Sequence, residues 1–251
     1  MSSKIRIASG LLLAYPALTV IANSWAALVD QWPGHLLDGL LLVLVLSVVG
    51  VHLRRGREWA YTSALVCSGG FAVIMVLYEL AIASLWGREA WADWPTFGYA
   101  FHYAPLMLFA SSFALLALDS TLPGARRRAV TFAAVALGME LVLMALIARF
   151  GIGSVFGPRS WNQLALGLSQ VPGEILLSQM RMCCGYSNHT IISDWIDPHW
   201  GGITRQGIPT LVAANTVGLV GVLAIARSLL MRVRHVRGPA HAAAAAPAAR
   251  G

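Results

Sequence analysis

The sequence predicts an all-α integral membrane protein with six transmembrane helices and both termini in the cytoplasm. The chain of 251 residues is 57% apolar and only 12% charged, about half the charged share of a soluble domain. Apolar runs of roughly 20 residues, the length that crosses a bilayer, recur along the chain. Arginines collect in every second connection between these runs, as the positive-inside rule expects.

Each apolar run is predicted to be a helix, because hydrocarbon offers no partner to open backbone groups and the alternation of a barrel strand is missing. In chain order the runs are Ile7–Val29, His35–His52, Trp59–Trp86, Phe97–Leu118, Ala129–Phe150 and Ile208–Leu230. The first exceeds the apolar length of a signal peptide, so we expect it to be an uncleaved span. Residues 1–237 form one predicted transmembrane domain, and residues 238–251 a disordered cytoplasmic tail.

The basic clusters set the predicted orientation. Arg54, Arg55 and Arg57 join the second and third runs, Arg126–Arg128 join the fourth and fifth, and further arginines follow the sixth. We interpret the net charge of +7 as a topology signal in a plasma (inner) membrane protein. The expected partners are membrane lipid and other membrane subunits, and no nucleic acid.

A long excursion, residues 151–207, separates the fifth and sixth runs and is predicted to lie outside. The stretch Trp161–Met182 carries too many polar side chains for lipid exposure, and a span there would move the last arginines outside. Within residues 160–182 we expect two short interfacial or re-entrant helices, the second opened by Pro172. A connection this long is more often functional than a short one.

Ionisable side chains inside the predicted spans are candidate catalytic residues, because they are costly in hydrocarbon. At about 1.5 Å per residue, Glu79 lies roughly 10 Å, His102 roughly 8 Å and Glu140 roughly 15 Å below the outer face. The matching depths predict a Glu79–His102 pair, and Asp38 lies near the outer end of the second run. A desolvated carboxylate suits acid–base work, with His102 as a relay.

Aromatic side chains at the same level are candidate substrate-binding residues. They are Tyr78 and Tyr103 beside the glutamate and histidine, and Trp91, Trp94, Trp195 and Trp200 as the roof of an outward-facing pocket. The inner half of the spans offers only weakly polar groups. Two structural alternatives stay open, namely interhelical hydrogen bonds that hold the bundle together and an interfacial tryptophan belt.

The excursion also contains potential metal ligands, Cys183, Cys184, His189 and His199. The spacings typical of zinc sites, Cys-x₂-Cys and His-x₃-His, are missing. The sulfur ligands would favour copper if a metal binds. The alternative is a folded loop with packed thiols and ordinary hydrogen bonds.

The stretch Trp86–Pro95 resembles the tryptophan-rich periplasmic motif of haem-handling proteins of cytochrome c maturation, with His35 and His199 placed as flanking histidines. The Trp-x-Trp-Asp core of that motif is missing. Phe156-Gly157-Pro158 is similar in place to a feature of the A-type subunit of copper membrane monooxygenases, whose acidic first loop is missing. These resemblances imply haem or copper at the outer face, and we assign the chain to neither family.

We therefore predict a small membrane-embedded enzyme, or the membrane subunit of one, acting on a lipophilic substrate by acid–base chemistry in an outward-facing polar pocket. The reaction would be a cyclisation, isomerisation or hydrolysis. One alternative is a redox or binding subunit that holds haem or copper at the outer face. Another is a permease-like protein, which the nearly bare inner half disfavours. The sequence contains no phosphate-binding loop and no nucleophile elbow.

Overall fold

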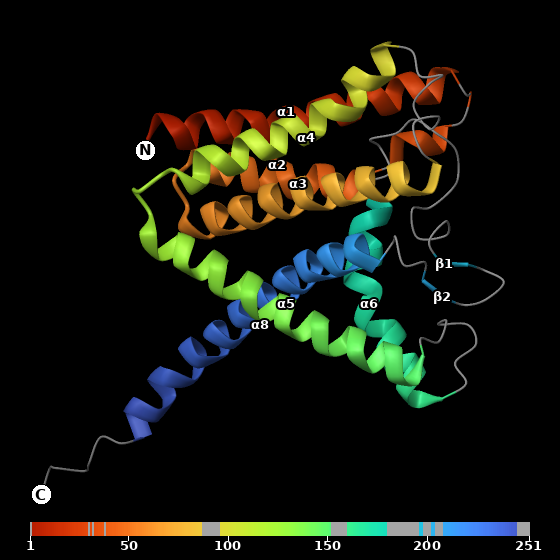
Figure 1. The fold of residues 1–251 in the computed structure, drawn as a ribbon. Coiled ribbons are helices and arrows are strands. Elements are labelled where there is room, and N and C mark those ends of the chain that lie inside the picture. The colour runs from red at the N-terminus through yellow and green to blue at the C-terminus, as the bar shows by residue number, and fades with distance from the viewer. Residues whose placement is uncertain are drawn as a thin grey trace, which may run out of the picture.

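The computed structural model describes residues 2–29, 31, 33–37, 39–86, 96–151, 160–179, 196–197, 202–203 and 208–244, some of them by their backbone alone. The described chain is helical apart from one pair of two-residue strands (Figure 1). The elements are α1 (Ser3–Val29), the 3-10 helix η1 (Pro33–Leu37), α2 (Leu40–Arg54), α3 (Glu58–Trp86), α4 (Thr96–Ala117), α5 (Pro123–Phe150), α6 (Trp161–Gln179), the antiparallel strands β1 (Ile196–Asp197) and β2 (Gly202–Ile203), and α8 (Ile208–Ala244).

Four described helical segments are long and apolar enough to cross a membrane. They are Ser3–Val29, Glu58–Leu77, Pro123–Phe150 and Ile208–Arg227. Helix α2 and the Tyr103–Ala117 part of α4 are apolar but shorter. Among the described residues, four segments rather than six therefore have the length and composition of a membrane span.

The second predicted run is divided into two elements. The sequence predicts one helix over His35–His52, whereas the structure has η1 and then α2, which starts at Leu40. Gly39 lies between them with a φ of 67°, a conformation that glycine adopts without steric cost. The 15 residues of α2 extend over about 22 Å, less than the roughly 30 Å hydrocarbon core.

The larger part of the core lies among α1, α2, α3 and α4, which run side by side in Figure 1. The Phe109 ring lies 4.8 Å from the Tyr15 ring and 4.9 Å from the Phe71 ring, measured between centroids. The hydroxyl of buried Tyr61 donates a hydrogen bond to the Leu116 carbonyl. These contacts join α1, α3 and α4, and α2 packs against α1 and α3, so the four helices form one packed unit.

In Figure 1, helix α6 crosses α3 and α5 near the ends of these helices that lie away from the N-terminus. It contacts α5, α8 and α2. It is one continuous helix with Pro172 inside, so the prediction of two short helices divided at Pro172 is wrong. The physical reason lies in α8, where Asn215 contacts the backbone on both sides of the proline. Helix α8 continues to Ala244, into the segment for which the sequence predicts disorder.

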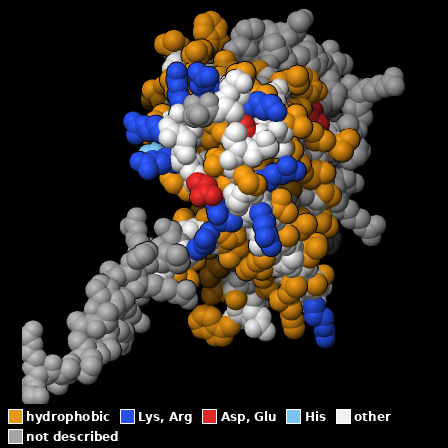
Figure 2. Space-filling view, turned by 90° about the vertical axis from the view of Figure 1, so that its left-hand side faces the viewer, with side chains coloured by type: hydrophobic (Ala, Val, Ile, Leu, Met, Phe, Trp, Pro, Cys, Tyr) orange, Lys and Arg blue, Asp and Glu red, His pale blue; other side chains and the backbone are white. Residues whose placement is uncertain are grey.

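The connections that carry basic clusters meet at one end of the molecule, as Figure 2 shows. The Lys4 ammonium donates to the Leu118 carbonyl at 2.9 Å, which joins the start of α1 to the α4–α5 connection. The Arg128–Glu58 ion pair joins the starts of α5 and α3. We call this the basic end; its cationic residues include Lys4, Arg6, Arg54, Arg55, Arg57, Arg126, Arg127 and Arg128.

Candidate functional site

Glu140 is the buried carboxyl around which the candidate site is built. It lies on α5 one helical turn after Ala136, and residues four apart share a helix face. Both residues have 0% exposure. Because Ala136 faces the interior against Leu219 and Val220 of α8, the same face carries Glu140 into the contact between α5, α6 and α8.

Two carboxamides hold one oxygen of Glu140. The Asn215 amide nitrogen on α8 donates a hydrogen bond to Glu140 Oε2, and Gln170 Nε2 on α6 donates to the same oxygen at 3.4 Å. Asn215 and Gln170 are also fully buried. The second carboxyl oxygen, Glu140 Oε1, and the Gln170 amide oxygen have no hydrogen-bond partner among the described residues.

Asn215 also bridges the proline interruption of α6. Its amide nitrogen donates to the Ser169 carbonyl at 3.1 Å, and its amide oxygen accepts from the Gly173 backbone N–H at 3.0 Å. An uninterrupted helix joins these two backbone groups directly, since they are four residues apart. Pro172 disturbs that turn because it lacks an N–H and its ring crowds the preceding turn. The Asn215 side chain therefore provides partners for backbone groups beside the proline.

Close packing places Asn215 within reach of α6. A side chain at Gly173 would put its Cβ 2.8 Å from the Asn215 backbone, and one at Gly218 would put its Cβ 2.8 Å from the Pro172 carbonyl carbon. Small residues at these positions allow the two helix backbones to approach closely, as is common inside membranes. The glycines thus bring the Asn215 amide close to the α6 backbone beside Pro172.

The chemistry that this arrangement supports is the binding and release of a proton. No Lys, Arg or His contacts Glu140 among the described residues, and an unpaired charge in a dry interior is costly. A proton on Oε1 removes the charge and makes the group a donor. Since Oε1 has no partner in the described part of the chain, it is the atom that is free to carry this proton.

Glu79 and Tyr103 form a second polar contact, between α3 and α4. The Tyr103 hydroxyl donates to Glu79 Oε2 at 3.4 Å, and Tyr103 is 38% exposed. The sequence predicts Tyr103 beside Glu79, and this proximity is present. It also predicts a Glu79–His102 pair, but the His102 and Tyr78 side chains lie outside what the structure describes, as does the side chain of His35.

Most of the predicted outer site lies outside the described residues. These positions are Asp38, Trp91, Trp94, Cys183, Cys184, His189, Trp195, His199 and Trp200. In the described ranges, no group of three or more His, Cys, Asp or Glu side chains is arranged to hold a metal ion. The proposed pocket roof and the proposed haem or copper ligands therefore remain predictions from the sequence.

Two features of the site escape sequence reasoning. Asn215 is recognisable as a polar group in the outer half of its span, but its contact with Glu140 depends on how α8 packs against α5. Gln170 reads as one of many polar residues of the excursion. One sequence signal could have pointed to Gln170: it lies three residues before Gly173, so both residues lie on one face of a helix beside the proline.

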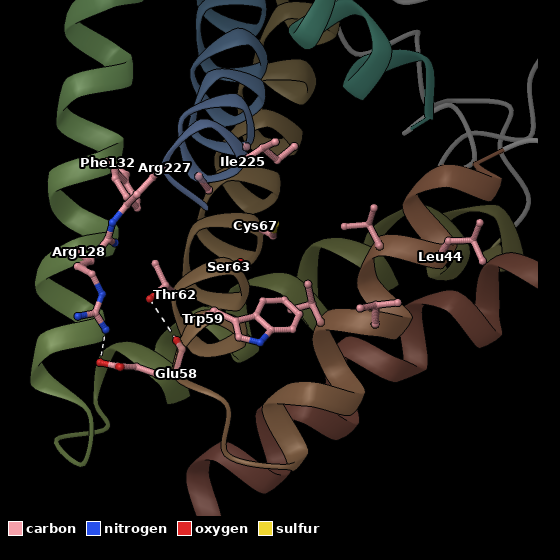
Figure 3. Close-up of a pocket in the computed structure, with 15 residues that line it drawn as sticks. Leu44, Glu58, Trp59, Thr62, Ser63, Cys67, Arg128, Phe132, Ile225 and Arg227 are labelled. Carbon is pink, nitrogen blue, oxygen red and sulfur yellow. Dashed lines mark hydrogen bonds and ion pairs between the residues drawn. The ribbon is translucent and has the colours of Figure 1, made fainter. Parts of the chain in front are cut away.

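A separate groove lies toward the basic end, between α2, α3, α5 and α8 (Figure 3). Its volume is about 900 Å³. The walls are largely apolar, while Glu58, Arg128 and Arg227 line one side, with the Glu58–Arg128 ion pair visible in Figure 3. The sequence predicts a pocket in the other half of the molecule, whereas the weakly polar side chains of Thr62, Ser63 and Cys67 line this groove.

No protein-family model, curated protein or solved structure matches the chain. Fold and site alone define its class: a helical protein with four segments suited to cross a membrane, and a buried carboxyl held by two carboxamides where α5, α6 and α8 meet.

Proposed function

We propose that this protein is a membrane-embedded enzyme, or the membrane subunit of one, in which Glu140 exchanges a proton with a lipophilic substrate. The observation that carries the proposal is the geometry of Glu140: Oε2 accepts from Asn215 and Gln170, while buried Oε1 has no partner among the described residues. A positioned carboxyl in a dry site is suited to general acid–base catalysis. Cyclisation, isomerisation and hydrolysis are the reaction classes expected.

The proposal includes six spans in the plasma (inner) membrane, with the basic end and both termini in the cytoplasm. The gathering of Lys and Arg at one end supports this orientation (Figure 2). The apolar helices α2 and α4 would complete the six spans, with α2 extended by η1. Helix α6 would enter from outside as a re-entrant helix, because its Gln170 meets Glu140, ten residues before the end of α5.

A permease-like function is the second candidate, and the groove favours it. A permease needs passages on both sides of a central group. The groove lies toward the basic end, with Glu58 and Arg128 in its lining, and the predicted tryptophan-roofed pocket would face the opposite side. Glu140 would then couple transport to a proton.

The test compares Glu140→Gln with Met139→Leu, a neighbouring variant whose side chain is 42% exposed and faces away from the cluster. Both are expressed in cells beside the wild-type protein, and membrane and medium lipids are compared by mass spectrometry. Wild type and Met139→Leu are expected to convert the same lipophilic compounds, and Glu140→Gln none. Full conversion by Glu140→Gln would overturn the enzyme proposal; redistribution of unchanged compounds across the membrane would identify the permease.

The predicted outer residues are tested in the same cells. Glu79→Gln and His102→Ala are expected to abolish conversion while leaving membrane insertion intact. Full activity of either variant would remove that residue from the mechanism. A haem absorption band or stoichiometric copper in the purified protein would favour the redox subunit instead.

A further inference from the structure

We infer that the groove at the basic end binds one anionic glycerophospholipid of the surrounding membrane. This binding site is independent of the proton chemistry at Glu140. The phosphate would lie at Arg227, and one acyl chain would lie along the apolar wall of α2. The argument has three parts, namely the charge at the mouth, the chemistry of the walls and the available volume.

The charged side chains of the groove leave a surplus positive charge. Glu58 pairs with Arg128, and their side chains are 52% and 35% exposed. Arg227 has no carboxylate partner within the described part of the chain, and its guanidinium lies 5.8 Å from the centroid of the Phe132 ring. A guanidinium offers several donors in a planar fork that matches phosphate oxygens. The mouth therefore complements an anionic headgroup.

The walls complement an acyl chain. Leu44, Val48 and Ile225 line the groove and are 55%, 51% and 63% exposed. The Trp59 side chain lies between Arg128 of α5 and Leu44 of α2 in the view of Figure 3. Aromatic side chains of this kind are typical of the membrane interface. The polar end and the apolar wall thus have the order of a phospholipid, from headgroup to chain.

The shape separates this groove from an ordinary lipid-facing surface. Its volume of about 900 Å³ lies within the range of roughly 300–1,000 Å³ typical of small-molecule sites. Gly221 on α8 contributes open space, since a Cβ added there would meet nothing within 4 Å. A single chain is therefore held between helices rather than against one of them.

The first test is a lipid titration of the full-length protein in detergent, followed by native mass spectrometry. Phosphatidylglycerol is expected to bind more tightly than phosphatidylcholine. Arg227→Gln should weaken phosphatidylglycerol binding about fivefold, as expected for loss of one cation near an anionic lipid. Arg127→Gln is the matched control, because Arg127 belongs to the same end and does not line the groove. Equal weakening by both variants would indicate general attraction to the basic end and overturn the proposal.

The second test fills the groove without changing charge. Gly221→Leu should abolish phosphatidylglycerol binding. Gly138→Leu should bind like wild type, because Gly138 has equally open surroundings on α5 and does not line the groove. Thermal unfolding of both variants checks that they are folded. Wild-type lipid binding by folded Gly221→Leu would overturn the proposal, as would no preference between the two lipids.

Discussion

The side chain of Asn215 serves two helices at once. It contacts backbone groups on both sides of Pro172 and also donates to Glu140. Buried backbone groups without partners are costly, and more so where water is excluded. One residue thus links the integrity of α6 to the position of the proposed proton-exchanging carboxyl.

Removal of this side chain should be destabilising. Asn215→Ala leaves the Ser169 carbonyl, the Gly173 N–H and Glu140 Oε2 each short of one bond, so we expect a loss of about 2 kcal/mol in the free energy of unfolding. Denaturant unfolding in micelles measures it. Thr216→Ala is the control, because that hydroxyl bonds the Val212 carbonyl of its own helix at 2.7 Å. Equal losses in the two variants would contradict the bridging role.

Asp119, in the connection between α4 and α5, is a second residue whose environment has a measurable consequence. Burial alone would raise the pKa of this carboxyl, but hydrogen bonds from Ser2 and Thr121 and the nearby charge of Lys4 outweigh it and lower the pKa below 3.8. The Thr121 backbone N–H donates to Asp119 Oδ1 at 2.8 Å. The ionised carboxyl therefore holds the start of α1 to this connection.

The stability that Asp119 provides should depend on pH. Because the pKa of the folded state is depressed, this stability is fully present above about pH 4 and is lost as pH falls through the folded-state pKa. Asp119→Asn should accordingly unfold more easily than wild type near neutral pH, and the difference should shrink in acid. Unfolding midpoints of both proteins, measured from neutral pH to about pH 3, check this; a constant difference would contradict it.

At the scale of elements, the crossing of α6 and α8 depends on the absence of side chains. Gly218→Ala would place a Cβ against the Pro172 backbone, so we expect a loss of about 1–3 kcal/mol in stability. Gly221→Ala lies three residues later on the same helix, and the added Cβ would meet nothing within 4 Å. We expect this variant to have the same stability as wild type or a slightly higher one. Thermal unfolding in detergent compares the pair. If both variants unfold alike, the helices do not approach as closely as described.

The sequence predicts the helices well where one local signal dominates. Both ends of α3 and the end of α5 follow from long apolar runs, with α3 ending at Trp86 and α5 at Phe150 as predicted. Helix α5 begins at Pro123, six residues before the predicted Ala129, and includes the basic cluster Arg126–Arg128 in its first turns. The predicted break at Pro172 is wrong for a physical reason. The side chain that supports the helix at this proline, Asn215, lies 43 positions further along the chain. Periodicity records neighbours three or four residues apart, so it cannot reveal a partner on another helix.

The same limit applies to the candidate sites. Glu140 is predictable because an ionisable residue in an apolar run stands out, and Tyr103 because it lies near Glu79 in predicted depth. The groove is not predictable, since Val48, Cys67 and Ile225 look like ordinary lipid-facing or core residues. Only the arrangement of α2, α3, α5 and α8 turns them into the lining of one space.

For the whole molecule, the basic end predicts which regions are accessible from outside the cell. In a protein with Cys67, Cys183 and Cys184 replaced by alanine, Ser160→Cys and Arg57→Cys each provide one thiol. A membrane-impermeant maleimide should label Ser160→Cys in intact cells, and Arg57→Cys only after the membrane is opened. Labelling of Arg57→Cys in intact cells would invert the proposed orientation.

The bridge from α8 to α6 also has a consequence for biosynthesis. The ribosome makes α6 before it makes Asn215, so the turn around Pro172 emerges ahead of the side chain that supports it. Until α8 enters the membrane, the amide and carbonyl beside the proline must find water or another donor and acceptor. A nascent chain halted before Asn215 should therefore keep α6 accessible to proteases, and a chain long enough to insert α8 should protect it.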